Sequence, residues 1–224
     1  MNFQMFSQDP NDHAPFSPSS PSWINMTDEQ VLSAWKNKFR TVLGTDIHEW
    51  ASGEINCHNK PASVREVSRG IKRHIYNKYK RDPEKLDLMF RHLRYLPSEA
   101  YGTVKTFIND VVTNDMLSEQ KVGYSYFFNG TIDAVKFDKK LLQIYDLKTG
   151  STPAKFEQLY IYCAEYCLQH SINPFEISFE IRIYQNDEIF GENPASSDIL
   201  SLMDNIVHKN KILMKFEGVT AYDR

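Results

Sequence analysis

Two acids and a lysine fall close together in a stretch of the chain that is rich in strand-forming residues. Residues 129–150 read NGTIDAVKFDKKLLQIYDLKTG, with a polar turn at 138–140 between two strand patterns. A hairpin of this kind brings Asp133 and Asp146 side by side. Lys148 shares their site, because strand residues two apart point to the same face.

This grouping has a specific chemical use. Two clustered carboxylates repel each other unless a hard cation lies between them. A lysine beside a metal-bound water can orient that water and can stabilise the negative charge that develops on a phosphate. Asp133, Asp146 and Lys148 are therefore the residue types of a metal-dependent phosphodiesterase.

A simpler interpretation makes Asp133 a turn acid and the Asp-x-Lys pair an exposed strand edge. It leaves the surrounding pattern unexplained. Gly130 stands three residues before the first acid, and a Thr-Gly pair follows the lysine. Gln158 and Tyr162, four residues apart in the next helix pattern, lie on one helix face. The fuller pattern favours a site over an exposed edge.

The chain resembles the RecB-like branch of the PD-(D/E)XK nuclease superfamily in three segments, Gly130-Thr-Ile-Asp133, Asp146-Leu-Lys148-Thr-Gly150 and Gln158-x-x-x-Tyr162. The resemblance implies that the two acids hold a divalent metal, Mg²⁺ or Mn²⁺, and that Lys148 is catalytic. It also implies that Gln158 and Tyr162 lie beside the site and contact the nucleic acid.

The helix pattern that precedes the hairpin contains G-x-x-x-H, ending at His48. Periodicity alone favours a surface or core histidine, but RecB-like nucleases carry a metal-binding histidine in this motif. The resemblance therefore implies His48 as a metal ligand, and the carbonyl of Leu147 completes the expected set. Asp46 and Glu49 remain candidates if the register differs. Glu119, at the start of a strand pattern, is either a peripheral ligand or an exposed acid.

Positive charge is concentrated before the hairpin. Residues 65–94 hold ten Lys and Arg against four Asp and Glu, although the whole chain has a net charge of −3. Arg69, Lys72 and Arg73 lie on the polar face of a helix pattern with interleaved tyrosines. Such a face suits phosphate contact and base stacking. The alternative is a solvated helix face with no partner.

The order of the elements predicts an α/β fold. Helix patterns cover 27–51, 63–80, 86–96, 98–117, 158–170 and 196–215, and strand patterns cover 118–128, 130–137, 141–148 and 176–184. Gly44 marks either a junction between two helices or a close approach of the backbone to the sheet. Pro83 interrupts the helix pattern of the residues around it. We expect an extended, proline-rich arm at 1–22 and one domain at 23–224. Within the domain, a helical extension (23–117) precedes a restriction-endonuclease-like three-layer core (118–224) with a mixed sheet.

Composition limits the other classes. No apolar run approaches the roughly 18 residues of a membrane span, and the start of the chain lacks a secretory signal pattern. Three cysteines, an odd number, argue against a disulfide framework and for a reducing, cytoplasmic location. Some relatives hold an iron–sulfur cluster with four cysteines, so none is expected here.

The resulting hypothesis is a Mg²⁺- or Mn²⁺-dependent DNA nuclease, with exonuclease action expected, encoded by a phage or mobile element and working in a bacterial host. DNA ends or single strands are the expected partners, with a homo-oligomer or a phage recombination protein as further expectations. Two alternatives stay open. One is a catalytically silent protein of the same fold that binds DNA ends or a host complex, and the other is a structure-selective resolvase.

Overall fold

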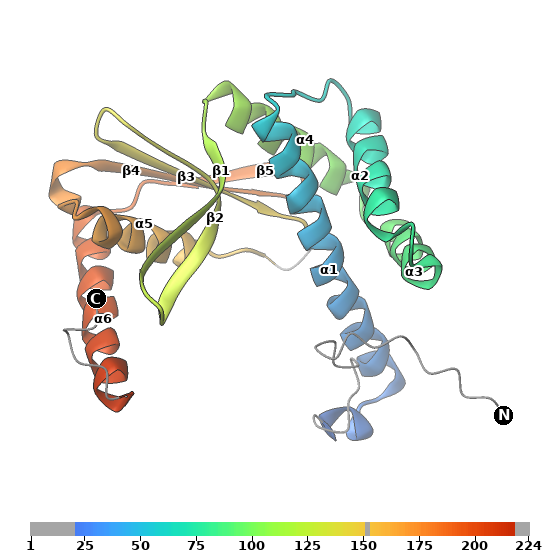
Figure 1. Cartoon of the computed structure of the whole chain (residues 1–224), viewed down its shortest axis with the longest axis horizontal. Helices are drawn as coiled ribbons and strands as arrows, with labels where there is room; N and C mark the ends of the chain where they lie inside the picture. Colours follow the sequence, from blue (N-terminus) through green and yellow to red (C-terminus); the bar gives the residue numbers. More distant parts are fainter. Residues whose placement is uncertain (1–20, 151–152, 218–224) are drawn as a thin grey trace.

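A five-stranded mixed sheet forms the centre of the molecule (Figure 1). The computed structural model describes residues 21–150 and 153–217. The strands follow the order β1-β2-β3-β4-β5, and all neighbours are antiparallel except β3 and β4. Their bounds are β1 Leu117–Ser125, β2 Phe128–Asp138, β3 Leu141–Lys148, β4 Ser178–Gln185 and β5 Glu188–Glu192.

Helices cover both faces of this sheet. On one face, buried residues of α1 to α4 form a single core with Tyr145, Leu147 and Tyr184 of the sheet. On the other face, α5 and α6 form a second core with Ile144 and Ile183. The expected three-layer α/β arrangement with a mixed sheet is therefore confirmed. The helices are α1 Asp28–Asn56, α2 Val64–Tyr79, α3 Pro83–Leu93, α4 Ser98–Thr113, α5 Glu157–His170 and α6 Ser196–Phe216.

Local sequence explains where these elements begin. Thr27 and Gln30 form a capping box at the start of α1, in which each side chain bonds the other residue's backbone N–H. Ser63 caps α2 because its hydroxyl oxygen accepts the N–H of Glu66. Strand β3 is almost entirely buried, as expected of a central strand that is covered on both faces.

Several sequence-based boundaries were wrong. Helix α1 runs through Gly44 without a junction, and this glycine instead approaches the end of the sheet at Thr149. Helix α3 begins at Pro83, which occupies a first-turn position where its missing N–H costs nothing. The predicted strand 118–128 contains a turn that separates β1 from β2. Strand β5 was missed because all its residues are exposed and so show no alternation.

The predicted arm lies mostly outside the described residues, which begin at 21. Its last two residues are not extended, because Pro21 and Ser22 belong to a short 3₁₀ helix, η1 (Pro21–Asn25). Among the described residues, no helix combines the length and apolar character that crossing a membrane requires.

Candidate active site

The site lies where β2 and β3 separate. Their pairing ends at Ala134 and Tyr145, so the next two residues, Asp133 and Asp146, face each other without a ladder bond. Beyond this point a side chain links the two strands instead of a backbone bond. Oδ2 of Asp133 accepts the N–H of Leu147 at 2.7 Å. The N–H and C=O of one strand residue point to the same side. The carbonyl of Leu147 therefore faces this opening as well.

Helix α1 brings His48 to the same opening. Nδ1 of His48 lies 3.2 Å from Oδ1 of Asp133. Glu119 of β1 completes a group in which the possible ligand atoms of His48, Glu119 and Asp133 all lie within 4.8 Å of one another. The structure thus brings together the histidine and acid that the sequence implied, and Glu119 is both exposed and beside them.

The backbone at Glu119 is unusual. Its φ of 50° is left-handed, although its neighbours Ser118 and Gln120 both pair with β2. A residue other than glycine rarely adopts this conformation inside a strand, and such strain concentrates at functional sites. A single sequence carries no signal for this backbone conformation, although Glu119 itself was a candidate peripheral ligand.

Lys148 is held by two side chains from different elements. Its Nζ lies 3.1 Å from Oδ1 of Asp146 and donates to Oε1 of Gln158 at 2.9 Å. Nε2 of Gln158 donates in turn to the hydroxyl of Tyr162 at 2.9 Å. The Gln-x-x-x-Tyr motif of α5 therefore fixes the ammonium group from one side, while Asp146 fixes it from the other.

Tyr162 reaches this position because Gly130 has no side chain. A Cβ built on Gly130 would lie 2.8 Å from Cε1 of Tyr162, closer than real Cβ contacts allow. The glycine of the Gly-x-x-Asp segment and the tyrosine of the next helix are thus one packing unit. Neither residue reveals this contact on its own in the sequence.

For the phosphodiester cleavage that the sequence leads us to expect, we predict that Gly130→Ala lowers kcat about tenfold or more while KM changes little. The added methyl group displaces Tyr162, and small displacements of positioned groups have large kinetic effects. Steady-state kinetics on a labelled oligonucleotide would measure this. Gly191→Ala is the matched control, because its Cβ would meet nothing closer than 3.8 Å. A parent-like kcat for Gly130→Ala would show that the contact does not position Lys148.

The acids lie in an environment that favours a bound cation. Asp146 is only 3% exposed, and its Oδ2 lies 3.0 Å from Lys148 but accepts no hydrogen bond from a described residue. Burial and the charge of Asp133, only partly offset by Lys148, raise the pKa of Asp146 to about 6. Burial and the same charge raise the pKa of Glu119.

The pKa of His48 shifts in the direction expected of a histidine that lies among acids. Burial alone would lower its pKa, but the charge of Asp133 and the hydrogen bond to it outweigh burial and raise the pKa. Burial contributes most to the raised pKa values of Asp146 and Glu119, and the negative charge of Asp133 contributes to the shifts of all three residues. Carboxylate oxygens, a ring nitrogen and a backbone carbonyl form a donor set that suits a divalent ion.

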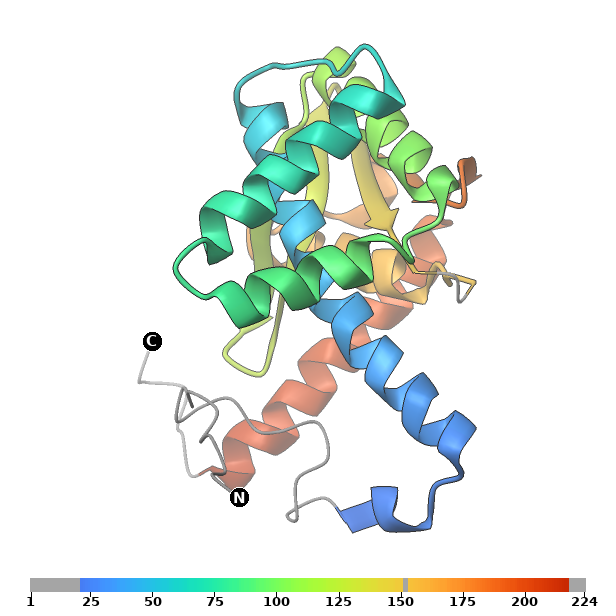
Figure 2. The ribbon, with the colours of Figure 1, turned by 90° about the vertical axis from the view of Figure 1, so that its right-hand side faces the viewer.

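Arg69, Lys72 and Arg73 are exposed on α2 but lie apart from this site. Val67, Ile71 and Ile75 form the buried face of α2, and helical geometry places Arg69 and Arg73 on the opposite face and Lys72 at its edge. Figure 2 shows α2 in front of α1, with the sheet behind both. The predicted basic face exists, but it points away from the opening between β2 and β3.

Lys78, one of the ten basic residues of 65–94, was expected on the same polar face of this helix, and this expectation was wrong. It turns inward, with its Nζ 2.8 Å from Oδ1 of Asp46 and in contact with Glu49. Tyr79 donates a further hydrogen bond to Asp46. Helical spacing also places 46 and 49 on the α2 side of α1, so the alternative register for the metal ligands is not supported.

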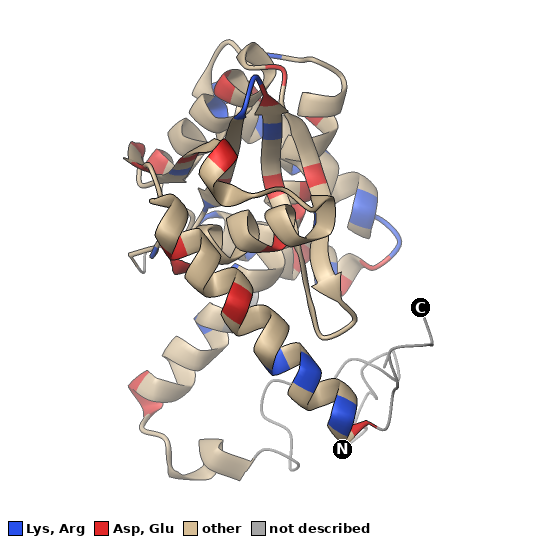
Figure 3. Ribbon diagram, turned by 90° about the vertical axis from the view of Figure 1, so that its left-hand side faces the viewer, with Lys and Arg blue, Asp and Glu red and all other residues tan. Residues whose placement is uncertain are grey.

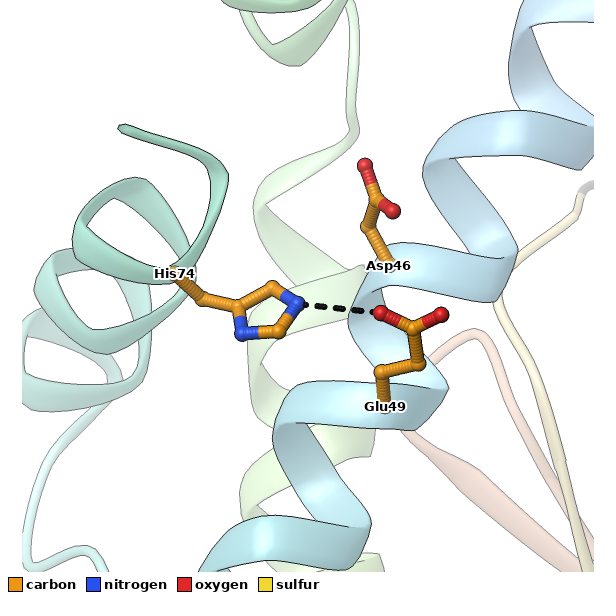
Figure 4. Close-up of side chains that lie close together, drawn as sticks. All are labelled: Asp46, Glu49 and His74. Carbon is orange, nitrogen blue, oxygen red and sulfur yellow. Dashed lines mark ion pairs between the residues drawn. The ribbon is translucent and has the colours of Figure 1, made fainter. Parts of the chain in front are cut away.

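Figure 4 shows His74 facing Glu49 across the α1–α2 interface, 3.4 Å away, with Asp46 one turn along α1. Asp46, Glu49 and His74 have the spacing of possible metal ligands. However, the ammonium of Lys78 already pairs with both acids, so this cluster is an ion-pair network between two helices. It holds α2 against α1 and is distinct from the site at Asp133.

We predict that Lys78→Met destabilises the protein by about 2 kcal/mol. The substitution leaves Asp46, which is 1% exposed, without its cation. Removing one partner of a fully buried pair costs about 3–5 kcal/mol, and the value is lower here because Lys78 is one-third exposed. Urea denaturation would measure the midpoint. Lys72→Met, on the exposed face of the same helix, should leave that midpoint unchanged. Equal midpoints for both variants would contradict this role.

Comparisons of the chain with protein-family models, with curated proteins and with solved structures find no match. Its function must therefore be argued from the chemistry of the site.

Proposed function

We propose that this protein is a divalent-metal-dependent nuclease that hydrolyses DNA phosphodiester bonds, with exonuclease action expected. One observation carries the proposal: a lysine, two carboxylates and an imidazole from three separate elements converge where β2 and β3 separate. Asp133, Asp146, Lys148 and His48 make direct contacts within this group. The mixed three-layer fold supports a restriction-endonuclease-like core.

The residues that would hold Mg²⁺ or Mn²⁺ are His48, Asp133, Asp146 and the carbonyl of Leu147, with Glu119 beside them. Asp146 Oδ2 is buried, accepts no hydrogen bond and has only the ammonium of Lys148 beside it at 3.0 Å, so the single charge of Lys148 faces the two carboxylates of Asp133 and Asp146. The bound ion would supply Lewis-acid polarisation of the phosphate and lower the pKa of its water.

Lys148 supplies a fixed positive charge and a hydrogen-bond donor. Gln158 and Asp146 hold its ammonium in one place, so little reorganisation is needed when charge develops on the phosphate. An ammonium in this position can also orient the attacking water. Gln158 and Tyr162 act as positioning residues, and they lie on the face where the nucleic acid strand would pass.

Cleavage assays test this proposal. The assay incubates three DNA substrates with Mg²⁺, with Mn²⁺ or with EDTA: a linear duplex, a circular duplex and a single strand. The linear duplex and the single strand carry a label at one end. We expect metal-dependent shortening of linear DNA and no cleavage in EDTA. Resistance of the circle would establish exonuclease action. An Asp146→Asn preparation controls for contaminating nucleases. Failure to cleave any substrate with either metal would contradict the proposal.

A further inference from the structure

The turn between β1 and β2 presents one aromatic side chain to solvent. Tyr126 is 91% exposed, although the backbone around it is well fixed. Asn129 donates from its side chain to the carbonyls of Ser125 and Tyr126, and the N–H of Phe127 donates to the hydroxyl of Ser125. The rigid turn therefore holds the ring out into solvent. A ring on a mobile turn would lose more conformational entropy on binding.

Helix α6 holds this turn in place. The hydroxyl of Ser125 donates to Oδ1 of Asn210 at 2.6 Å, and Asn210 is only 1% exposed. Lys209 and Lys211 flank this asparagine in sequence. Neighbouring helix residues are about 100° apart, so the two lysines emerge on either side of the contact with the turn. The two lysines therefore flank the turn that carries Tyr126, one on each side of its contact with α6.

The C-terminal half of α6 is strongly basic. Residues 205–216 contain Lys209, Lys211 and Lys215 and no acid, and all three lysines are exposed. Figure 3 shows blue segments along this half of the helix. Among the described residues, none of them forms an ion pair. The helix dipole explains a lysine in the last turn but not Lys209 and Lys211, because its effect falls off within one turn.

Strand β2 connects this surface to the candidate active site. It runs from Phe128 at the turn to Asp133, a span of about 17 Å at 3.3 Å per residue. Tyr162 packs against Gly130 between these two points. At the 3.4 Å rise of one duplex strand, this span corresponds to about five nucleotides.

We propose that Tyr126, Lys209, Lys211 and Lys215 form a binding surface for a single-stranded segment of the nucleic acid substrate. An unpaired base stacks on the exposed ring, and the lysines contact the phosphates on either side. A paired base within a duplex has no free face for this ring, so the surface selects a single strand. This inference rests on the proposed nuclease function and identifies the form of its substrate.

Fluorescence anisotropy with a labelled oligo-dT strand, in EDTA so that nothing is cleaved, tests the surface. Tyr126→Ala should weaken binding about tenfold, within the range for loss of one stacked base. Lys209→Gln with Lys211→Gln should flatten the slope of log K against log salt by about 0.7 for each lost contact. Lys139→Gln with Lys140→Gln removes the same charge from the exposed turn at the other end of β2 and should change neither quantity.

Parent-like binding by both the Tyr126 and the Lys209/Lys211 variants would overturn the inference. So would lysine-dependent binding to vesicles of anionic phospholipid with no effect on oligo-dT, which would identify a membrane surface. Cleavage with Mn²⁺ is scored separately. If the parent cleaves but these variants bind normally, the surface is wrong and the nuclease stands. If binding depends on Tyr126 but no metal supports cleavage, the binding surface stands and the nuclease proposal is wrong.

Discussion

Replacing Lys148 with alanine should lower the rate of phosphodiester cleavage about 10²-fold or more, the scale seen when one donor to a developing oxyanion is removed. The ammonium is the only side-chain cation in contact with Asp146 among the described residues, and Gln158 holds it from the other side. Its loss removes a charge that is already in place before the reaction begins. Single-turnover kinetics with saturating Mn²⁺ would measure the loss.

The fold should survive this change. Asp146 loses its cation, but its pKa is already raised to about 6, so it can take up a proton instead of remaining a buried charge. Circular dichroism would verify folding, and Lys139→Ala on the exposed turn of the same hairpin should retain parent activity. Undiminished turnover by a clean Lys148→Ala preparation would remove this lysine from the mechanism.

Neutralising either acid should abolish most divalent-ion binding. Asp133→Asn and Asp146→Asn keep the shape of each side chain but remove the charge that a hard cation requires. His48→Ala should weaken binding less, because it removes one neutral ligand and leaves the carboxylates. Titration calorimetry with Mn²⁺ would rank the three variants.

The His48 variant separates a ligand from a structural residue. Glu49→Gln is its control, because Glu49 lies on the α2 side of the same helix and pairs with Lys78. That variant should bind Mn²⁺ like the parent. If His48→Ala also binds like the parent, His48 only supports Asp133, and the G-x-x-x-H motif does not mark a metal ligand in this chain.

The central part of this site could be predicted because strand geometry is local. Asp133, Asp146 and Lys148 lie on two strands joined by a short turn, so alternation and the turn determine which side chains meet. Periodicity likewise predicted the helices, and the order of the elements predicted the mixed sheet. The contact of His48 with Asp133 spans 85 residues and followed only from the family resemblance.

Other features depend on packing that no single sequence displays. Lys78 looked like one more cation on a basic helix, yet it turns inward because two acids of α1 lie opposite. The role of Gly130 appears only when Tyr162 is placed beside it. Charge counting likewise located a basic helix face but not its direction, and α2 directs Arg69, Lys72 and Arg73 away from the site.

The proposed location of the metal site is tested most directly by anomalous scattering from a crystal of the protein soaked in Mn²⁺. We predict an anomalous peak at the opening between β2 and β3, in contact with the carboxylates of Asp133 and Asp146. Lys148 should lie beside it without contributing a ligand. A peak at Asp46, Glu49 and His74 alone, or no peak at saturating Mn²⁺, would contradict the assignment of this site as a metal-dependent nuclease centre.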